Sequence, residues 1–194
     1  MRLFVAALVP EVLQSNLFQT LQPARRAAAQ ARWVRPGQVH LTLAFLGEQP
    51  DTLLGVLLET LRPLGSRHRV LQLTLQGVGC FGRPRRPDVL YAGLSGEVEG
   101  LRALQADVQT TLEAVCPRAE GAQPKAFHPH LTLARARGRH GDAALSRCQR
   151  ALEERLGGAF SVDRVVLFQS QLGAGGALHT PLAEFPLSAE APAA

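Results

Sequence analysis

The sequence is poor in cysteine, lysine and the larger aromatic residues. Its three cysteines are widely spaced, so they predict neither a disulfide framework nor a thiolate metal site, and they suit a reducing cytoplasm. No apolar run is long enough to span a bilayer, and the apolar opening stops at Pro10, too early for a secretory leader. These absences predict a cytoplasmic protein with no membrane partner.

Basic charge outweighs acidic charge in a composition that is otherwise typical of globular proteins. The formal net charge is +5, and 46% of the residues are hydrophobic. A positive balance favours an anionic partner, with nucleic acid the first candidate. Lys125 is the only lysine, and Ala, Gly and Leu are abundant. A GC-rich genome produces such a composition, so the positive net charge can also be explained without any function. The role of the basic loop between Arg83 and Arg86 is also open, because it is either a contact to the RNA backbone or a solvated turn.

The stretch His-Leu-Thr-Leu-Ala occurs at residues 40–44 and again at residues 130–134. Each copy is predicted to be a strand, because it is apolar and carries a β-branched threonine. Residues i and i+2 of a strand share a face, so His40 lies beside Thr42 and His130 beside Thr132, with the leucines facing a core. A core accounts for the leucines, but it does not account for a polar His-Thr pair on the opposite face twice. The repeat therefore predicts a site built from both copies.

The order of predicted elements favours an α+β fold, with two lobes of similar build in a single domain over residues 1–194. Each lobe is expected to be a mainly antiparallel sheet backed by helices, because the strands come in hairpin-like runs and no Gly-rich turn follows the first strand. The tail 188–194 is expected to fray. Strands are predicted at about 2–8, 32–35, 39–46, 69–81, 88–94, 130–135, 160–169 and 182–187. Helices are predicted at about 10–30 (ended, kinked or divided at Pro23), 51–63 (with Asp51 or Thr52 near its cap), 97–115 and 142–156.

Two opposed imidazoles suit general acid–base chemistry near neutral pH. A histidine has an ordinary pKa of about 6.5, so one of a pair can take a proton while the other gives one. Phosphodiester cleavage needs both steps, and the threonine hydroxyls with a nearby arginine can hold the non-bridging oxygens. No metal is required, and a His128–His130 metal site lacks a third ligand at any standard spacing.

The wider frames around the two motifs resemble those of a known family. They run from Trp33 to Gly47 and from Phe127 to Arg135. Paired His-x-Thr-x motifs in such frames are similar to those of the 2H phosphoesterases, in particular the bacterial and archaeal RNA 2′,3′-cyclic phosphodiesterases, also called LigT-like or ThpR-type 2′-5′ RNA ligases. The opening residues 2–6 and the late segment 167–172 also match, so the resemblance covers nearly the whole chain.

The resemblance implies a pseudo-twofold, bilobal, monomeric protein with both motifs in a central cleft. It implies hydrolysis of RNA 2′,3′-cyclic phosphate ends, tRNA fragments among them, to 2′-phosphates without a metal or cofactor. By position, His40 is the proton donor to the leaving 3′ oxygen and His130 is the proton acceptor that activates water. Thr42, Thr132 and Arg135 are expected to bind the phosphate. In reverse, the same pair would join such an end to a 5′-hydroxyl.

Four further residues keep open interpretations. Phe45 and Arg135 lie equally far beyond their histidines, and strict alternation puts both on the wrong face unless the strands end or bulge there. Phe45 is either a base-stacking platform or a core residue. His128 either faces the cleft or is structural. His179 stands where members of this family often carry a tyrosine. It either replaces a contact made by that tyrosine or simply lies in a turn.

Two other functions compete with the RNA-end phosphodiesterase. One is a phosphodiesterase that acts on cyclic nucleotides, ADP-ribose cyclic phosphate or 2′-5′ oligonucleotides. The other is a module that binds a nucleotide or RNA without turnover. The intact His and Thr in both motifs argue against pure binding, and the basic charge favours a polymer over a small ligand.

Overall fold

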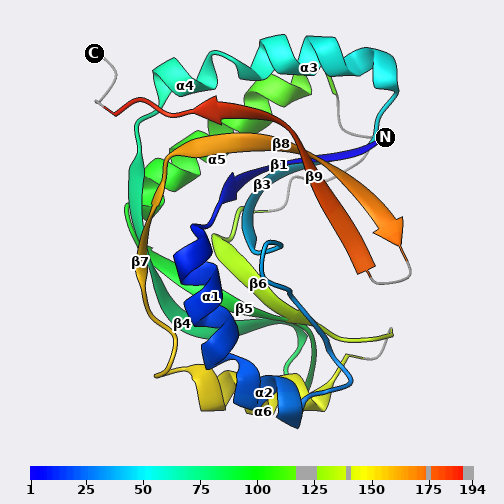
Figure 1. Cartoon of the computed structure of the whole chain (residues 1–194), viewed down its shortest axis with the longest axis vertical. Helices are drawn as coiled ribbons and strands as arrows, with labels where there is room; N and C mark the ends of the chain where they lie inside the picture. The colour runs from blue at the N-terminus through cyan, green and yellow to red at the C-terminus, as the bar shows by residue number, and fades with distance from the viewer. Residues whose placement is uncertain (117–125, 139–140, 174–175, 190–194) are drawn as a thin grey trace.

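Two separate antiparallel sheets organise the chain (Figure 1). The computed structural model describes residues 1–116, 126–138, 141–173 and 176–189. The strands are β1 (Arg2–Leu8), β2 (Arg32–Trp33), β3 (His40–Glu48), β4 (Leu71–Arg83), β5 (Arg86–Gly96), β6 (His130–Arg135), β7 (Ala159–Val162), β8 (Arg164–Gly173) and β9 (Gly176–Pro186). The helices are α1 (Glu11–Thr20), α2 (Gln22–Ala27), the 3₁₀ turn η1 (Asp51–Leu53), α3 (Leu54–Leu61), α4 (Leu64–Arg67), α5 (Val98–Glu113) and α6 (Ala143–Leu152).

The strand order defines two lobes. Sheet A has the order β3-β1-β8-β9, and sheet B has the order β2-β6-β5-β4-β7. At one end of the molecule α5 packs against β3 and α4 against β9 of sheet A, and α3 packs on α5, whereas α1, α2 and α6 lie at the sheet B end (Figure 1). Every pairing within the two sheets is antiparallel. The predicted α+β fold with two helix-backed antiparallel lobes is confirmed.

The lobes are not consecutive halves of the chain. Sheet A joins β1 and β3 to the late strands β8 and β9, and β2 from the early chain pairs with β6 in sheet B. The helices cross over as well, because α5 follows β5 of sheet B but packs against β3 of sheet A. This exchange brings β3 and β6 into contact at the boundary between the lobes (Figure 1).

Most local predictions agree with the structure, and the exceptions have physical reasons. Pro23 divides the first helical segment, because it occupies the first turn of α2 directly after α1. No side chain caps the predicted helix from residue 51. Its first turn is the 3₁₀ turn η1, Pro50 holds the N-cap position, and Asp51 follows directly, so Asp51 lies near the cap as predicted but its side chain does not form the cap. The predicted strand 160–169 is two strands, because Asp163 lies between β7 in sheet B and β8 in sheet A.

The expected fraying from Ser188 is wrong at that residue. The Ser188 carbonyl accepts a hydrogen bond from the Val70 amide at 2.9 Å, and its own amide donates to the Gly65 carbonyl at 3.0 Å. These bonds hold the segment beyond β9 against the chain that leads into β4. Residues 190–194 of the predicted tail lie outside the described residues.

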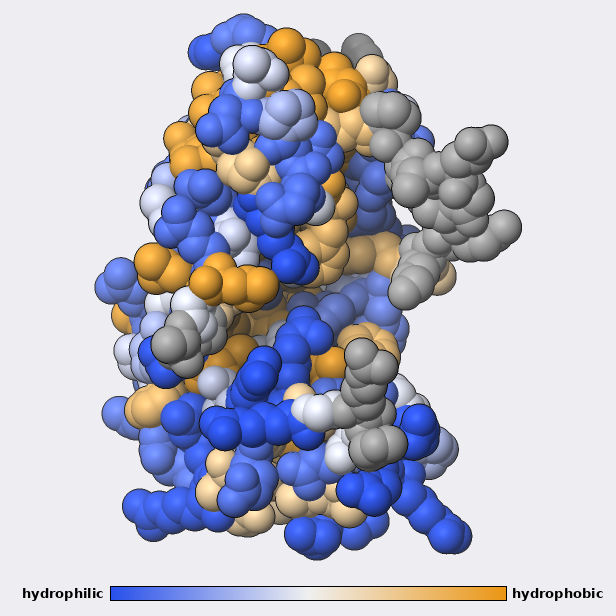
Figure 2. Space-filling view, turned by 90° about the vertical axis from the view of Figure 1, so that its right-hand side faces the viewer, coloured by the Kyte–Doolittle hydropathy of each residue, from blue (hydrophilic) through white to orange (hydrophobic). Residues whose placement is uncertain are grey.

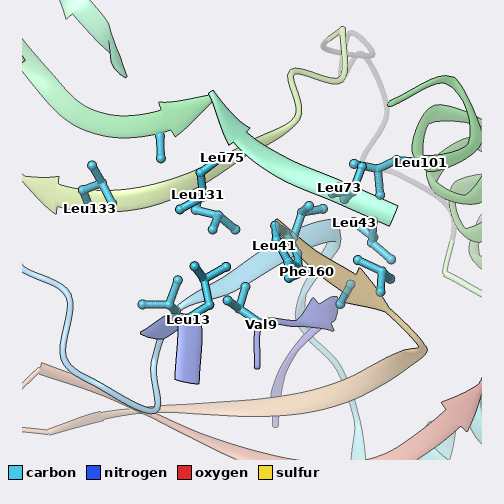
Figure 3. Close-up of a cluster of buried hydrophobic side chains, with 14 of the residues drawn as sticks. Val9, Leu13, Leu41, Leu43, Leu73, Leu75, Leu101, Leu131, Leu133 and Phe160 are labelled. Atoms are coloured by element: carbon cyan, nitrogen blue, oxygen red, sulfur yellow. The ribbon is translucent and has the colours of Figure 1, made fainter. Parts of the chain in front are cut away.

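The leucines of both repeats point into one buried cluster that links the lobes. Leu41 and Leu131 are 1% and 0% exposed and lie in the same cluster as Phe160, Leu73 and other apolar residues of sheet B (Figure 3). Burying a leucine side chain stabilises the fold by roughly 1.5–3 kcal/mol. The repeated strands are therefore fixed by their apolar faces, which leaves their polar faces free for other roles.

Each repeated strand carries a β-bulge at the same place. On β3, Thr42 pairs with Ala6 and Ala44 pairs with Val5, so Leu43 has no partner on β1. β6 shows the same shift against β5, between its threonine and its alanine. A bulge inserts one extra residue and changes which face the following side chains occupy. Residues beyond each bulge therefore point the opposite way from strict alternation.

At each bulge, a backbone carbonyl accepts a hydrogen bond from another part of the protein. The Leu43 carbonyl accepts a hydrogen bond from Nε2 of Gln105 on α5 at 3.1 Å. The Leu133 carbonyl accepts one from the Val34 amide at 2.9 Å. A buried carbonyl without a partner is costly, so these donors stabilise the bulged geometry.

We expect Gln105→Ala to lower the free energy of unfolding by about 1 kcal/mol, because the Leu43 carbonyl loses its side-chain donor. Urea unfolding measures this change. The matched control is Gln109→Ala on the same helix, where the amide bonds the exposed Glu113 at 3.4 Å. An equal loss of stability in both variants would contradict a stabilising role for the bond to the bulge.

Candidate active site

The polar faces of the two repeated strands lie on opposite sides of one cleft. His40 and Thr42 on β3 are half-buried, as are His130 and Thr132 on β6. The imidazole of His40 lies within electrostatic range of both His130 and Arg135. Figure 2 shows a hollow between the upper and lower lobes, with hydrophilic side chains along its lower border. The structure therefore brings the two predicted His-Thr pairs together.

The bulges place Phe45 and Arg135 on the same face as the histidines. Phe45 pairs with Phe4, and His40 pairs with Leu8, so the two lie on one face of sheet A. Arg135 pairs with Val89 and lies likewise on the histidine face of sheet B. The sequence required each strand to end or bulge if these residues are to reach the cleft, and both strands have a bulge there. Phe45 is 73% exposed, which excludes the alternative that it is a core residue.

Each histidine is oriented by the same backbone contact. Nδ1 of His40 lies 2.8 Å from the carbonyl oxygen of Gln38, and Nδ1 of His130 lies 2.7 Å from that of His128. A carbonyl oxygen only accepts hydrogen bonds, so Nδ1 carries hydrogen in both protonation states of the ring. The titrating atom is therefore Nε2 in both residues, and both side chains can exchange a proton through it.

His40 has a pKa well below the ordinary histidine value. Burial is the main cause, and it outweighs the bond to the Gln38 carbonyl, which favours the charged ring. Repulsion from His179, Arg135 and His130 acts in the same direction as burial. Together these effects lower the pKa of His40 from 6.5 to about 4.

His130 lies in a cluster of aromatic rings on sheet B. Its ring centroid is 5.0 Å from that of Phe81 and 5.4 Å from that of Tyr91. Burial lowers the pKa of His130, and the neighbouring His128 and Arg135 lower it further. At pH 7 both cleft histidines are therefore neutral in the free protein, and an anion bound between them would favour their charged forms.

The structure adds residues to the cleft that the sequence did not assign. His179 lies edge-on to His40 with ring centroids 5.3 Å apart, and its buried Nδ1 has no hydrogen-bond partner among the described residues. Tyr91 stacks on Phe81 at 4.3 Å beside His130. The ring of His128 contacts the rings of both Phe81 and Tyr91. His128 is therefore part of the aromatic cluster at the cleft, which favours the interpretation that it faces the cleft over a structural role. Tyr91 is the only tyrosine of the sequence, but a single ring on a strand gives no signal of its position.

The basic loop of the sequence can also be placed in the fold. The basic loop is shorter than expected, because β4 and β5 extend into it and pair Arg83 with Arg86 around a tight turn of exposed residues.

In the described ranges of the chain, no group of three His, Cys, Asp or Glu side chains could hold a metal ion. No helix there is long and apolar enough to cross a membrane.

Comparison with known proteins gives matches along nearly the whole chain. The family model of the 2′-5′ RNA ligase superfamily matches residues 10–174. A Thermus thermophilus protein named RNA 2′,3′-cyclic phosphodiesterase is 33% identical over 98% of this chain and 92% of its own length. One of the same name from Aeropyrum pernix is 32% identical over 75% of this chain and 80% of its own.

Solved structures agree with these matches. The crystal structure of TT0787 from Thermus thermophilus has a TM-score of 0.79 at 30% identity and covers 98% of this chain and 100% of its own. The structure of E. coli LigT complexed with 3′-AMP has a TM-score of 0.73 at 25% identity, covering 96% of this chain and 97% of its own. The resemblance that the paired frames predicted is confirmed, and the chain belongs to the 2′-5′ RNA ligase superfamily.

Proposed function

We propose that this protein hydrolyses the 2′,3′-cyclic phosphate end of RNA to a 2′-phosphate by acid–base catalysis with two histidines. The observation that carries the proposal is the pair of equivalent bulged strands, which present His40 and His130 to one cleft with both Nδ1 atoms bonded to carbonyls. The names of the Thermus and Aeropyrum relatives support the substrate class.

The proposed reaction is a displacement at phosphorus. The oxygen of a water molecule forms a bond to phosphorus, and its proton moves to Nε2 of His130. The bond from phosphorus to the 3′ oxygen breaks, and that oxygen takes the proton from Nε2 of His40. The assignment of His40 as donor and His130 as acceptor follows the family resemblance, since the two side chains have equivalent geometry. The reverse sequence would join the cyclic end to a 5′-hydroxyl.

Three cleft residues besides the histidines are suited to the phosphate. Thr42 and Thr132 share the histidine faces and can donate hydrogen bonds to non-bridging oxygens. Arg135 is suited to two parallel hydrogen bonds with the same group. Donors fixed where negative charge develops stabilise the transition state, so these residues act without a metal. The exposed ring of Phe45 is suited to stack on the terminal base.

We expect His40→Ala and His130→Ala each to lower kcat by at least about 100-fold on an RNA with a 2′,3′-cyclic phosphate end, since each variant loses one proton-transfer group. The assay is run in EDTA and identifies the product, which should carry a 2′-phosphate. His68→Ala is the matched control, because His68 bonds Asp107 at 2.7 Å on α5 outside the cleft. Full turnover in either cleft variant, or cleavage of small cyclic nucleotides alone, would contradict the proposal.

We expect kcat/KM to fall as pH rises above 7, by up to about tenfold per pH unit. The reason is that burial lowers the pKa of His40 to about 4 and that of His130 below 6.5, so the free protein must take up a proton to supply the acid. The phosphate of bound substrate raises both values, so kcat should depend less on pH. A flat profile of kcat/KM from pH 6 to 8 would show that one histidine is already charged.

We expect Phe45→Ala to raise KM for RNA about tenfold with a smaller change in kcat, because stacking on an aromatic ring contributes about 1–3 kcal/mol per base. Phe45→Tyr keeps the ring and should keep the KM. Stability should be unchanged in both variants, because the side chain is 73% exposed. An unchanged KM in Phe45→Ala would exclude the stacking role.

A further inference from the structure

The hairpin of β8 and β9 extends past the rest of sheet A (Figure 1). β1 pairs with β8 only as far as Gln169, so residues 170–173 of β8 and 176–179 of β9 pair with each other alone. We call these residues the hairpin tip. Leu172 and Leu178 of the tip are 76% and 60% exposed, so burial of apolar side chains does little to hold it in place.

One side chain joins the hairpin tip to the segment that leads into β3. Nε2 of Gln38 donates a hydrogen bond to the Ala177 carbonyl at 2.7 Å, although the two residues are 139 positions apart in the sequence. In the described part of the chain, no other hydrogen bond joins the tip to a different element. The position of the tip therefore depends on Gln38.

The hairpin tip carries His179 to the imidazole that Gln38 also contacts. The ring centroids of His179 and His40 lie 5.3 Å apart with the ring planes at 86°, so the edge of one ring meets the face of the other. The ring of Phe4 lies 4.9 Å from each of them. Gln38 thus touches the ring of His40 through its own carbonyl, and it holds a second ring against His40 through its side chain and the Ala177 carbonyl.

The contribution of His179 to this arrangement is its packing. Its Nδ1 is buried and has no hydrogen-bond partner among the described residues. A buried nitrogen without a partner costs stability, so hydrogen bonding through this atom does not explain why the ring lies there. An aromatic edge against the imidazole of His40 restricts the rotation of that imidazole and keeps water away from it. This agrees with burial as the main cause of the lowered pKa of His40.

The surroundings of His130 are built differently. Its Nδ1 partner is the carbonyl of His128, which directly precedes β6, and the rings beside it are Phe81 and Tyr91. These two rings belong to β4 and β5, which pair with each other on both sides of the two residues. His130 therefore packs against the continuous ladder of its own sheet, whereas His40 packs against a segment that leaves its sheet.

We propose that Gln38 is a positioning residue, which holds the hairpin tip against the cleft so that His179 fixes the imidazole of His40 for proton transfer. This inference rests on the proposed function, in which Nε2 of His40 gives a proton to the leaving 3′ oxygen. The bond to the Gln38 carbonyl fixes Nδ1 but leaves the ring free to swing about that atom, and the edge of His179 opposes this movement. A displacement of about 1 Å at a reacting group can lower the rate about 100-fold, so a contact that fixes the ring affects kcat.

The first test measures kcat on an RNA with a 2′,3′-cyclic phosphate end. Gln38→Met, which keeps the length of the side chain but removes its donor, should lower kcat about tenfold, as should His179→Ala. The double variant should lose no more than either single variant, because both changes break the same arrangement. His179→Phe keeps an aromatic edge and should recover most of the kcat that His179→Ala loses. Gln49→Met is the matched control and should keep its kcat, because Nε2 of Gln49 bonds the Leu46 carbonyl at 2.7 Å near the other end of β3.

The second test does not depend on activity. Titration of His40 by NMR should give a midpoint near 4 in the wild type, and Gln38→Met should move it upward toward 6.5, because water reaches the ring when the tip is released. His130 and Arg135 also act on His40, and this variant leaves both in place. Gln49→Met should leave the midpoint unchanged.

The two tests separate this inference from the proposed function. Additive losses in the double variant, or no recovery of kcat in His179→Phe, would overturn the positioning role while hydrolysis by the wild type still stands. An unchanged midpoint of His40 in Gln38→Met would overturn it as well. If the wild type hydrolyses no cyclic end, the proposed function fails, and the titration still decides whether Gln38 holds the tip over His40.

Discussion

The β-bulge shared by β3 and β6 is the constraint on which the candidate site depends. Before the bulge, alternation places histidine and threonine on the cleft face and a leucine in the core. The extra residue then shifts the pattern, so Phe45 and Arg135 also face the cleft. A regular strand would bury the arginine or expose the leucines. The bulge thus reconciles an apolar core with a polar site on the same short strand.

The packing of the two lobes also determines the protonation state of the cleft. Burial between the sheets removes water from both imidazoles, and Arg135 adds positive charge beside them. Both effects oppose a charged histidine, so the free cleft holds two neutral rings and a cation. A phosphate reverses this balance, because its negative charge favours both the guanidinium and a protonated ring. Under the proposed function, the fold therefore couples the uptake of the proton that the acid donates to the binding of an anion.

The chain builds this cleft by exchanging elements between lobes, which no local pattern reveals. β8 and β9 return to complete the sheet begun by β1 and β3, and α5 crosses from sheet B to support the bulge of β3 through Gln105. Local periodicity was sufficient for α5 and for β6, whose predicted limits match the structure within two residues. It was insufficient at Asp163, where the chain changes sheets while keeping an extended backbone.

The sequence by itself determined the two His-Thr pairs, their strands and the family, because each of these depends on residue types a few positions apart. It also set the condition under which Arg135 reaches the cleft, namely that the strand must end or bulge before it. Only the tertiary structure decided that the bulge is present, that His179 lies against one histidine and that Tyr91 lies beside the other. These contacts join residues far apart in the chain. They arise from sheet register and lobe packing, which are set by the whole core rather than by any one segment.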